Sequence, residues 1–304
     1  MSDLQAVVMG RVGVDLYPGQ LETPLEEVDT FHKFVGGFAG NVSTGLARLG
    51  VRTAIVSAVG DDGHGRYVRS FLEREGVDCR WLAVDPELRT ALAFCEAWPP
   101  DRFPITFYRT PTCPDWELRP DQLDLAAIGR APLAYVSGTG LAREPSRAAT
   151  LAVARARRQA DTVLDLDWRP MLWRDPADYA ASVRELLPYC RIVLGSDEEV
   201  DAAVGGGGPR TLLELGPGVV VQKHGPDGAT VFRDGTQSDV AGRRVQVVNG
   251  LGAGDAFAAA FGWKLLQGAD AADAAEAANR AGAHVAGRLG CSIAMPRAED
   301  LDGN

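Results

Sequence analysis

The feature that most constrains this chain is a regular alternation between short β-branched runs and longer stretches with helical periodicity. The runs read AVVMG, TAIVSAVG, LAYVSG, DTVLDLD, RIVLG and GVVVQK, and stretches such as SRAATLAVARARRQA and DYAASVRELLP separate them. Apolar strands that alternate with helices are typical of a parallel sheet covered by helices on both faces. We therefore expect an α/β fold with a central, mostly parallel sheet.

Two segments interrupt this alternation. Residues 12–35 and 90–110 contain prolines and lack a helical pattern, and they resemble hairpin-like strands inserted into the α/β body. We expect them to form a small β-sheet over one end of the main sheet, within a single domain of residues 1–304. Ligands of open α/β sheets bind beyond the carboxyl ends of the strands, so the small sheet would act as a lid.

The composition excludes several classes of function. The chain of 304 residues has a formal net charge of −10 and no run of Lys or Arg, so we expect no nucleic-acid partner. No apolar stretch approaches the roughly 20 residues of a membrane span, so we expect no membrane partner. The five cysteines are scattered without a C-x-x-C motif, which argues against a disulfide framework or a zinc site and favours a cytoplasmic protein. P-loop and G-x-G-x-x-G motifs are also missing.

The stretch VVNGLGAGDAF at 247–257 places three glycines before a carboxylate, at the start of an Ala-rich helical run. One interpretation is structural: the glycines end a strand and Asp255 stabilises the first helical turn. The other is chemical: free N–H groups of Gly252, Ala253 and Gly254 bind an anion, and Asp255 accepts a proton beside it. We also expect Gly254 to adopt a special backbone angle.

A second glycine cluster, GGFAGN at 36–41, precedes the helical pattern NVSTGLARLG. It is compatible with a flexible turn in which Asn41 caps the helix. It is also compatible with a binding site, where Gly36 and Gly37 let the backbone approach a small ligand and Asn41 binds the ligand's hydroxyls. The cluster alone leaves both interpretations open.

Taken together, GGFAGN and GLGAGD resemble the two signatures of the PfkB or ribokinase-type carbohydrate kinases, whose order of elements matches nearly the whole chain. The resemblance implies a ribokinase-like three-layer sandwich with a β-sheet lid. It also implies that Asp255 deprotonates a sugar hydroxyl, while the N–H groups of Gly252, Ala253 and Gly254 form an anion hole for the transferred phosphoryl group. ATP and Mg²⁺ would be the cofactors, and a monovalent cation such as K⁺ is left open.

The resemblance assigns roles outside these motifs as well. Asp15 in GVDLYP matches a carboxylate that binds sugar hydroxyls, although a turn residue at a strand end is an equal interpretation. Beside the nucleotide the resemblance places Lys223, Gly225 and Gly228 of KHGPDG and Asn279 of AANRAGA.

Two positions depart from the family pattern. Ser196 stands where the family's N-x-x-E has asparagine, which leaves Ser196 as a weaker nucleotide contact, while Glu199 keeps the carboxylate that organises Mg²⁺ through water. Asn249 and Gly250 replace the first two residues of D-[ST]-x-G-A-G-D, which weakens the expectation of a cation there and leaves Asp255 intact.

Further stretches narrow the acceptor. WPPDRFPITFYR (98–109), LDLDWRPMLW (164–173) and VNGLGAGDAF (248–257), with MGRVGVDLYP, resemble the 5-dehydro-2-deoxygluconokinases of myo-inositol catabolism, which phosphorylate the terminal hydroxyl of a keto-deoxy sugar acid. The alternatives are 2-keto-3-deoxygluconate kinases and fructokinase- or ribokinase-like enzymes. Arg109 and Arg169 stand at predicted strand ends, where a guanidinium can bind a carboxylate bidentately. For Arg169, an ion pair with Asp167 is an equal interpretation.

Two expectations concern the protein as a whole. A non-catalytic sugar-acid sensor on the same fold is an alternative, but a sensor has no need of Asp255 beside an intact G-A-G. A homodimer that forms through the lid is expected, because several lid phenylalanines would lie on an exposed sheet, namely Phe31, Phe34, Phe94 and Phe103.

Overall fold

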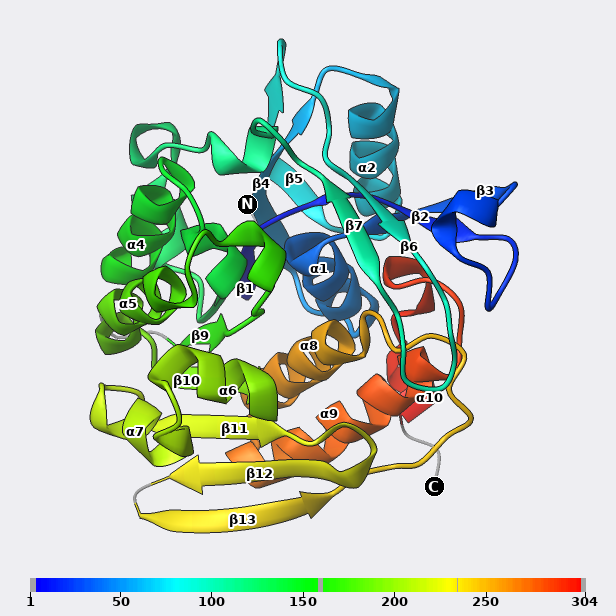
Figure 1. The fold of residues 1–304 in the computed structure, drawn as a ribbon. Coiled ribbons are helices and arrows are strands. Elements are labelled where there is room, and N and C mark those ends of the chain that lie inside the picture. The colour runs from blue at the N-terminus through cyan, green and yellow to red at the C-terminus, as the bar shows by residue number, and fades with distance from the viewer. Residues whose placement is uncertain (1–3, 158–160, 234, 302–304) are drawn as a thin grey trace.

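The computed structural model describes residues 4–157, 161–233 and 235–301, and within them one large sheet runs through the molecule (Figure 1). Its strands are β1 (Ala6–Met9), β4 (Thr53–Gly60), β5 (Asp78–Asp85), β8 (Leu133–Ser137), β9 (Asp161–Asp165), β10 (Ile192–Ser196), β11 (Val219–Lys223), β12 (Gly228–Arg233) and β13 (Thr236–Ala241). Their spatial order is β13-β12-β11-β10-β9-β8-β1-β4-β5. Along this spatial order, neighbouring strands pair in parallel from β11 through β10, β9, β8, β1 and β4 to β5. Strands β12 and β13 extend the β11 edge with antiparallel pairing.

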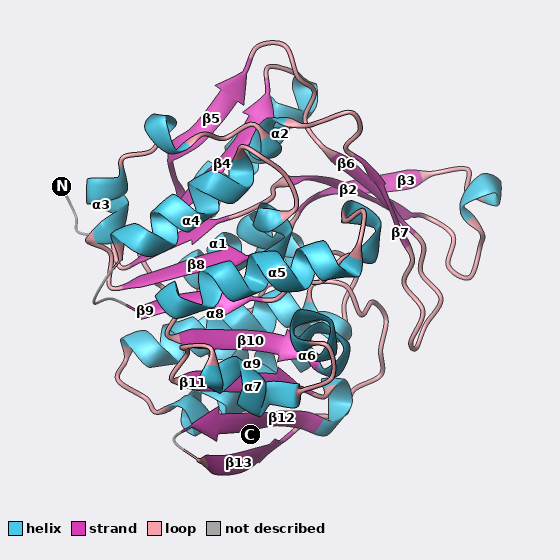
Figure 2. Ribbon diagram, turned by 60° about the vertical axis from the view of Figure 1, so that its left-hand side comes forward, coloured by secondary structure: helices cyan, strands magenta, loops and turns pink. Residues whose placement is uncertain are grey.

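Helices cover both faces of this sheet (Figure 2). One face packs against α1 (Phe38–Arg48), α2 (Gly63–Arg74), α8 (Ala253–Leu266) and α9 (Ala271–Ala286). The other packs against α3 (Leu125–Gly129), α4 (Ser146–Ala156), α5 (Pro176–Leu186), α6 (Asp197–Val204) and α7 (Gly208–Glu214), while α10 (Ala298–Leu301) packs on α9. Each face has its own cluster of buried apolar side chains, so the predicted α/β class with a mostly parallel sheet is confirmed.

Short 3-10 helices occupy several loops. Their bounds are η1 (Leu25–Glu27), η2 (Pro114–Trp116), η3 (Pro120–Gln122), η4 (Gly138–Leu141), η5 (Pro170–Leu172), η6 (Leu187–Tyr189), η7 (Gly225–Asp227) and η8 (Ser292–Ala294). Of these, η4 follows β8 directly and η5 follows the loop after β9. Both therefore lie at the carboxyl ends of parallel strands, where ligands of such sheets bind.

The second, smaller sheet also matches the prediction. It consists of β2 (Gly13–Pro18), β3 (Phe31–Gly36), β6 (Leu92–Cys95) and β7 (Ile105–Tyr108), in the order β3-β2-β6-β7. Figure 1 shows these four strands together at one side of the molecule. They come from the two inserted segments, although β3 ends one residue later than expected. We call this sheet the lid; its movement and the division into domains stay predictions.

Close packing of α1 and α8 depends on small residues. A Cβ atom added at Gly45 of α1 would lie 2.6 Å from the Cβ of Ala259 in α8. On another side of α8, a Cβ atom at Gly262 would lie 2.5 Å from the hydroxyl of Tyr135. The middle of α8, residues 256–263, is therefore enclosed by protein, which explains why this part of its sequence is apolar on all sides.

The lid touches the body through two of its phenylalanines. The Phe34 ring lies edge-on to Tyr17 of the neighbouring lid strand, with ring centroids 5.5 Å apart, and it packs against the buried cluster that includes Cys291 of the body. Phe103, between β6 and β7, lies over Gly250, where an added Cβ atom would be 2.9 Å from its ring. These contacts leave both rings half-buried, as Phe31 and Phe94 are, so the four lid phenylalanines are only partly exposed.

Three other lid aromatics, Phe31, Phe94 and Tyr108, form an outer cluster. Phe94 contacts Phe31 and Tyr108 at centroid distances of 5.2 and 5.1 Å, and Tyr108 is 59% exposed.

In the described part of the chain, no helix combines the length and the apolar character needed to cross a membrane. All five cysteines are buried free thiols.

Candidate active site

The first turn of α8 begins at a glycine with unusual backbone geometry. Gly252 is the N-cap and has φ 83°, in the left-handed region that glycine adopts readily. Gly254 lies inside the helix with ordinary backbone angles, so the expectation of a special angle there is corrected: Gly252 carries it. No side chain of the described residues caps the helix, and the N–H groups of its first turn have no partner within the helix.

Asp255, in the same turn, contacts α1. The amide Nδ2 of Asn41 donates a 2.6 Å hydrogen bond to Oδ2 of Asp255. The Ser292 hydroxyl in turn donates to Asn41 Oδ1 at 2.6 Å. Burial, followed by the charge of Asp167, raises the pKa of Asp255 to about 6. Among the described residues, none donates a hydrogen bond to Oδ1 of Asp255, so that oxygen is available to accept a proton.

A buried network of ion pairs lies beside Asp255. Arg11 follows β1, and its Nη2 is 3.2 Å from Asp167 Oδ1; Nη2 of Arg169 is 3.0 Å from the same oxygen. Thr139 donates to Asp167 Oδ2 at 2.7 Å. Burial alone would raise the pKa of Asp167, but the two guanidinium groups and the hydrogen bonds hold it below its usual value. The ion-pair interpretation of Arg169 is therefore the one that the geometry shows.

A second group of charges joins β9, β11 and α6. Lys223 Nζ donates to Asp165 Oδ2 at 3.2 Å and lies 3.8 Å from Glu199 Oε2. Burial works against the charge on Lys223, yet the two carboxylates raise its pKa above the ordinary value. Burial in turn raises the pKa of Asp165 to about 7.

Ser196 and Glu199 form a capping box at the start of α6. The Ser196 N–H donates to Glu199 Oε2 at 2.8 Å, and the Glu199 N–H donates to Ser196 Oγ at 3.3 Å. Glu199 Oε1 lies 3.8 Å from Arg169, so the carboxylate stands between that guanidinium and Lys223. Helix capping thus fixes the position of the glutamate.

The glycine pair before α1 allows two close approaches. A Cβ atom at Gly36 would lie 2.0 Å from Cγ of Asp15, and one at Gly37 would lie 2.7 Å from the carbonyl oxygen of Arg11. Burial raises the pKa of Asp15 to about 6. A cavity of about 10 Å³, the size of one water molecule, is lined by residues that include Arg11, Asp15, Gly37, Phe107 and Arg109.

Arg109 has a partner inside the protein. Its Nη2 lies 2.6 Å from Asp115 Oδ2, and its guanidinium lies 4.4 Å from the ring centroid of Trp116. Both charged side chains are buried. Because Arg169 is also paired, neither of the two arginines that were expected to bind a carboxylate has an unpaired charge.

The remaining predicted residues gather at the edge of the sheet. Gly228 has φ 114°, and a Cβ atom there would lie 2.1 Å from the Val240 carbonyl oxygen, so no side chain fits. Asn279 donates to the carbonyl oxygens of Val240 and Ala241 at 3.3 and 3.0 Å. Gly225 begins η7 with φ 58° and open space around it. All three residues lie close together next to β13. Lys223, the last residue of β11, joins this edge of the sheet to the region around Asp255.

Sequence reasoning missed Arg11, Asp165 and Asp167 as parts of the site, although each follows or ends a predicted strand. A polar residue at such a position is a usable signal, because strand ends meet at one edge of a parallel sheet. It also missed the link that Asn249 makes to the lid. Asn249 Nδ2 donates to the Leu251 carbonyl at 3.3 Å and to the Tyr17 hydroxyl at 3.4 Å, and Oδ1 accepts from the Leu251 N–H at 3.2 Å.

This arrangement favours one type of chemistry. The free N–H groups of α8 attract an anion, and Lys223 Nζ adds positive charge 3.5 Å from the Cβ position of Gly254. Asp255 is placed where a carboxylate can accept a proton from a hydroxyl beside that anion. No group of three or more metal-ligating side chains occurs in the described residues, so a cation would need oxygen atoms from the ligand as well.

Comparisons with known proteins agree with this geometry. The profile of the pfkB family carbohydrate kinases matches residues 3–298. A Bacillus velezensis protein named 5-dehydro-2-deoxygluconokinase is 33% identical over 309 residues, which cover 98% of this chain and 93% of the relative. The structure of Vibrio cholerae O395 fructokinase with fructose, ADP and calcium ion superposes with a TM-score of 0.86 at 27% identity, covering 99% of this chain and 98% of that one.

A second solved structure shows the shared fold. A putative ribokinase II from E. coli, in complex with ATP and Mg²⁺, superposes with a TM-score of 0.89 at 23% identity and covers 98% of both chains. The ribokinase-like arrangement expected from the glycine motifs is thereby confirmed.

We predict that Asp255→Asn raises the melting temperature at neutral pH. Because burial raises the pKa of Asp255 from 3.8 to about 6, the folded state binds the proton more tightly than the unfolded chain. The stability that the protonated carboxyl contributes is fully present below the unfolded pKa of 3.8, and it is lost as the pH rises through the folded pKa of about 6. The neutral variant still accepts the Asn41 hydrogen bond, so its advantage should be full at about pH 7.5 and small near about pH 4.

Thermal unfolding of both proteins across this range measures the difference. Asp201→Asn, on the exposed side of α6, serves as the control and should show no such trend. An advantage of equal size at both ends of the range would contradict the prediction.

Proposed function

Because the chain belongs to the pfkB family of carbohydrate kinases, we propose that it transfers the γ-phosphoryl group of ATP to the terminal hydroxyl of 5-dehydro-2-deoxygluconate, a keto-deoxy sugar acid. The proposal of phosphoryl transfer rests on one observation: Asn41 holds Asp255 beside the uncapped start of α8. The choice of acceptor is supported by the named Bacillus velezensis relative, which matches nearly the full length of the chain. A 2-keto-3-deoxygluconate kinase or another sugar kinase, such as a fructokinase, is the alternative.

Asp255 acts as the general base in this proposal. With a pKa of about 6, its carboxyl is mostly ionised at neutral pH and remains basic enough to take a proton from a hydroxyl as the new bond forms. Asn41 holds Oδ2, so Oδ1 faces the acceptor. Asp15, on the lid strand β2, binds other hydroxyl groups of the acceptor, and Gly36 and Gly37 leave room for it.

The start of α8 stabilises the transferred group. The N–H groups of Gly252, Ala253 and Gly254 act as preorganised donors toward the negative charge that the phosphoryl oxygens carry in the transition state. Lys223 adds a fixed positive charge next to Gly254. On the other side of Lys223, the turn with Gly225 and Gly228 and the helix residue Asn279 form the edge where we place the nucleotide.

Mg²⁺ fits the charges between β9 and α6. Bound with ATP, it would supply positive charge that neutralises the phosphate groups. Glu199 would hold it through water, because the capping box fixes this carboxylate near Lys223 and Arg169, while Ser196 is used in the cap. A monovalent cation fits less well, since the Asn249 side-chain oxygen already accepts the Leu251 N–H, and we leave it out of the proposal.

We place the enzyme in the cytoplasm, in myo-inositol catabolism. Five free thiols agree with a reducing compartment, and the acceptor agrees with that pathway. We expect neither nucleic acid nor a membrane as a partner, because the chain carries a net charge of −10.

We also propose a homodimer through the outer lid cluster of Phe31, Phe94 and Tyr108. Replacing Tyr108, the most exposed of the three, by Asp should convert a dimer into a monomer in sedimentation velocity, because a charge would have to be buried at the interface. Tyr189→Asp, at a position that is 40% exposed outside the lid, is the control. A monomeric wild-type chain would contradict the proposal.

We predict that Asp255→Asn lowers kcat by on the order of 10²–10⁴, the usual value of a general base, and leaves ATP binding nearly unchanged. Wild-type kcat should fall as the pH drops below about 6, because protonation removes the base. Steady-state kinetics from about pH 5 to pH 8 and a titration with a non-hydrolysable ATP analogue measure both effects. Near-normal kcat in the variant would exclude Asp255 as the base.

The acceptor is tested with a panel of keto-deoxy sugar acids and neutral sugars. We expect the highest kcat/KM for 5-dehydro-2-deoxygluconate. We also expect Arg169→Met to raise KM for the acid about tenfold or more, because the Arg169 side chain is one-third exposed beside Asp167. The KM for ATP should stay unchanged. Arg109→Met is a poor test, since it leaves Asp115 buried without its partner. Faster turnover of fructose or ribose would overturn the choice of acceptor.

A further inference from the structure

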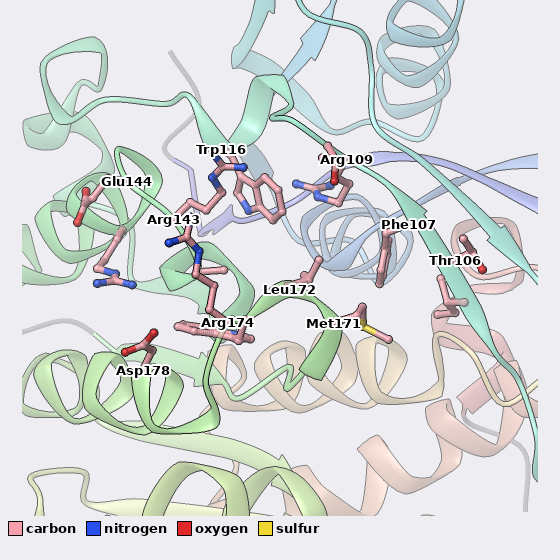
Figure 3. Close-up of a pocket in the computed structure, with 15 residues that line it drawn as sticks. Thr106, Phe107, Arg109, Trp116, Arg143, Glu144, Met171, Leu172, Arg174 and Asp178 are labelled. Carbon is pink, nitrogen blue, oxygen red and sulfur yellow. The ribbon is translucent and has the colours of Figure 1, made fainter.

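A second, larger cavity lies beside the proposed sugar site. It has a volume of about 630 Å³, which is in the range of small-molecule sites. Its walls come from the lid strand β7, the segment after it, the loop between η4 and α4, and the segment from η5 to α5 (Figure 3). Phe107 and Arg109 line both this cavity and the small one that contains Asp15, so the two cavities adjoin.

Three arginines of this cavity form no ion pair within the described residues. Arg143 donates to the Pro111 carbonyl and lies 5.4 Å from the Trp116 ring centroid. Arg147 donates only to a backbone carbonyl, that of Leu141, at 2.8 Å. Arg174 is exposed and makes no hydrogen bond or ion pair in the described part of the chain. Such a cluster is unusual for a protein with a net charge of −10, and it favours an anionic ligand.

Two buried donors on the cavity wall point to the same conclusion. Nε of Arg109 and Nε1 of Trp173 are buried without a hydrogen-bond partner among the described residues, and both side chains line the cavity. Arg109 as a whole is only 5% exposed. Buried donors are nearly always satisfied, so these two mark a part of the cavity wall whose polar groups are not paired within the described residues.

The cavity also contains groups that bind hydroxyls. Glu144 and Asp178 are exposed carboxylates on the same wall as the arginines and form no ion pair in the described residues, and Thr106 contributes a hydroxyl from β7. Carboxylates accept hydrogen bonds from sugar hydroxyls, whereas guanidinium groups bind carboxylate or phosphate. The donors and acceptors together match a molecule that carries both an anionic group and several hydroxyls.

We propose that this cavity is a binding site for a hydroxylated organic anion, a sugar acid or a sugar phosphate, held by Arg143, Arg147 and Arg174. The ligand is either the distal end of the acceptor or a second anion bound next to it. Since Phe107 and Arg109 belong to the lid side and Arg174 to the body, the ligand contacts both. The first of these identities rests on the proposed function, whereas binding of an anion by the three arginines is tested without phosphoryl transfer.

The test uses D-gluconate 6-phosphate as the probe, with the neutral polyol D-glucitol for comparison. Titration calorimetry on the full chain is carried out with a non-hydrolysable ATP analogue present, so that the start of α8 is already occupied. We expect the wild-type chain to bind the phosphate and not the polyol. The double variant R143Q/R174Q should raise Kd about tenfold or more, because two charge-assisted contacts are lost.

The matched control is R66Q, since Arg66 is 70% exposed on α2 and lies outside the cavity. It should bind like wild type, and all three proteins should have similar melting temperatures. Competition with the acceptor assigns the site to the acceptor's distal end, whereas a non-competitive pattern assigns it to a second anion; both support an anion site. No binding by wild type, unchanged Kd in R143Q/R174Q, or equal affinity for D-glucitol would overturn the inference.

Discussion

The hydrogen bond between Asn41 and Asp255 is the contact on which the site depends. It joins residues 214 positions apart and requires that α1 and α8 meet at their starts. That approach is possible because Gly45 has no side chain where α8 presents Ala259. A larger residue at either position would separate the helices and move the carboxylate away from the amide. Packing deep in the core therefore sets the geometry of the proposed base.

The electrostatics follow from placing many carboxylates at one sheet edge. Burial raises the pKa values of Asp15 and Asp255 to about 6, whereas Asp167, which contacts two guanidinium groups, has its pKa lowered. The same type of side chain thus behaves differently according to its partners. In the proposed function, Lys223 and the start of α8 provide the positive charge that an approaching phosphate needs in this acidic surrounding.

Local patterns were enough to predict the fold and the central motif. The six strand runs, the two inserted segments and the glycine motif before Asp255 are short-range signals, because period, composition and helix starts are set by neighbours in sequence. The partners of Arg109 and Phe103 were beyond reach. Arg109 pairs with Asp115 and Phe103 covers Gly250 only because loops fold against particular surfaces. Which side chain satisfies a buried charge is a tertiary property that a single sequence does not encode locally.

The lid is formed by two separate segments of the chain, β2 with β3 and β6 with β7. The start of α8 and the strands β9, β10 and β11 beside it follow later in the chain and belong to the body. The two poles of the site are thus built from different parts of the polypeptide. Changes in length or sequence of the β6–β7 segment alter the surroundings of the acceptor first, and they reach the start of α8 through the contact of Phe103 with Gly250. This division makes the architecture modular: one phosphoryl-transfer apparatus is compatible with many acceptors, and selection can exchange the recognition element without rebuilding the catalyst.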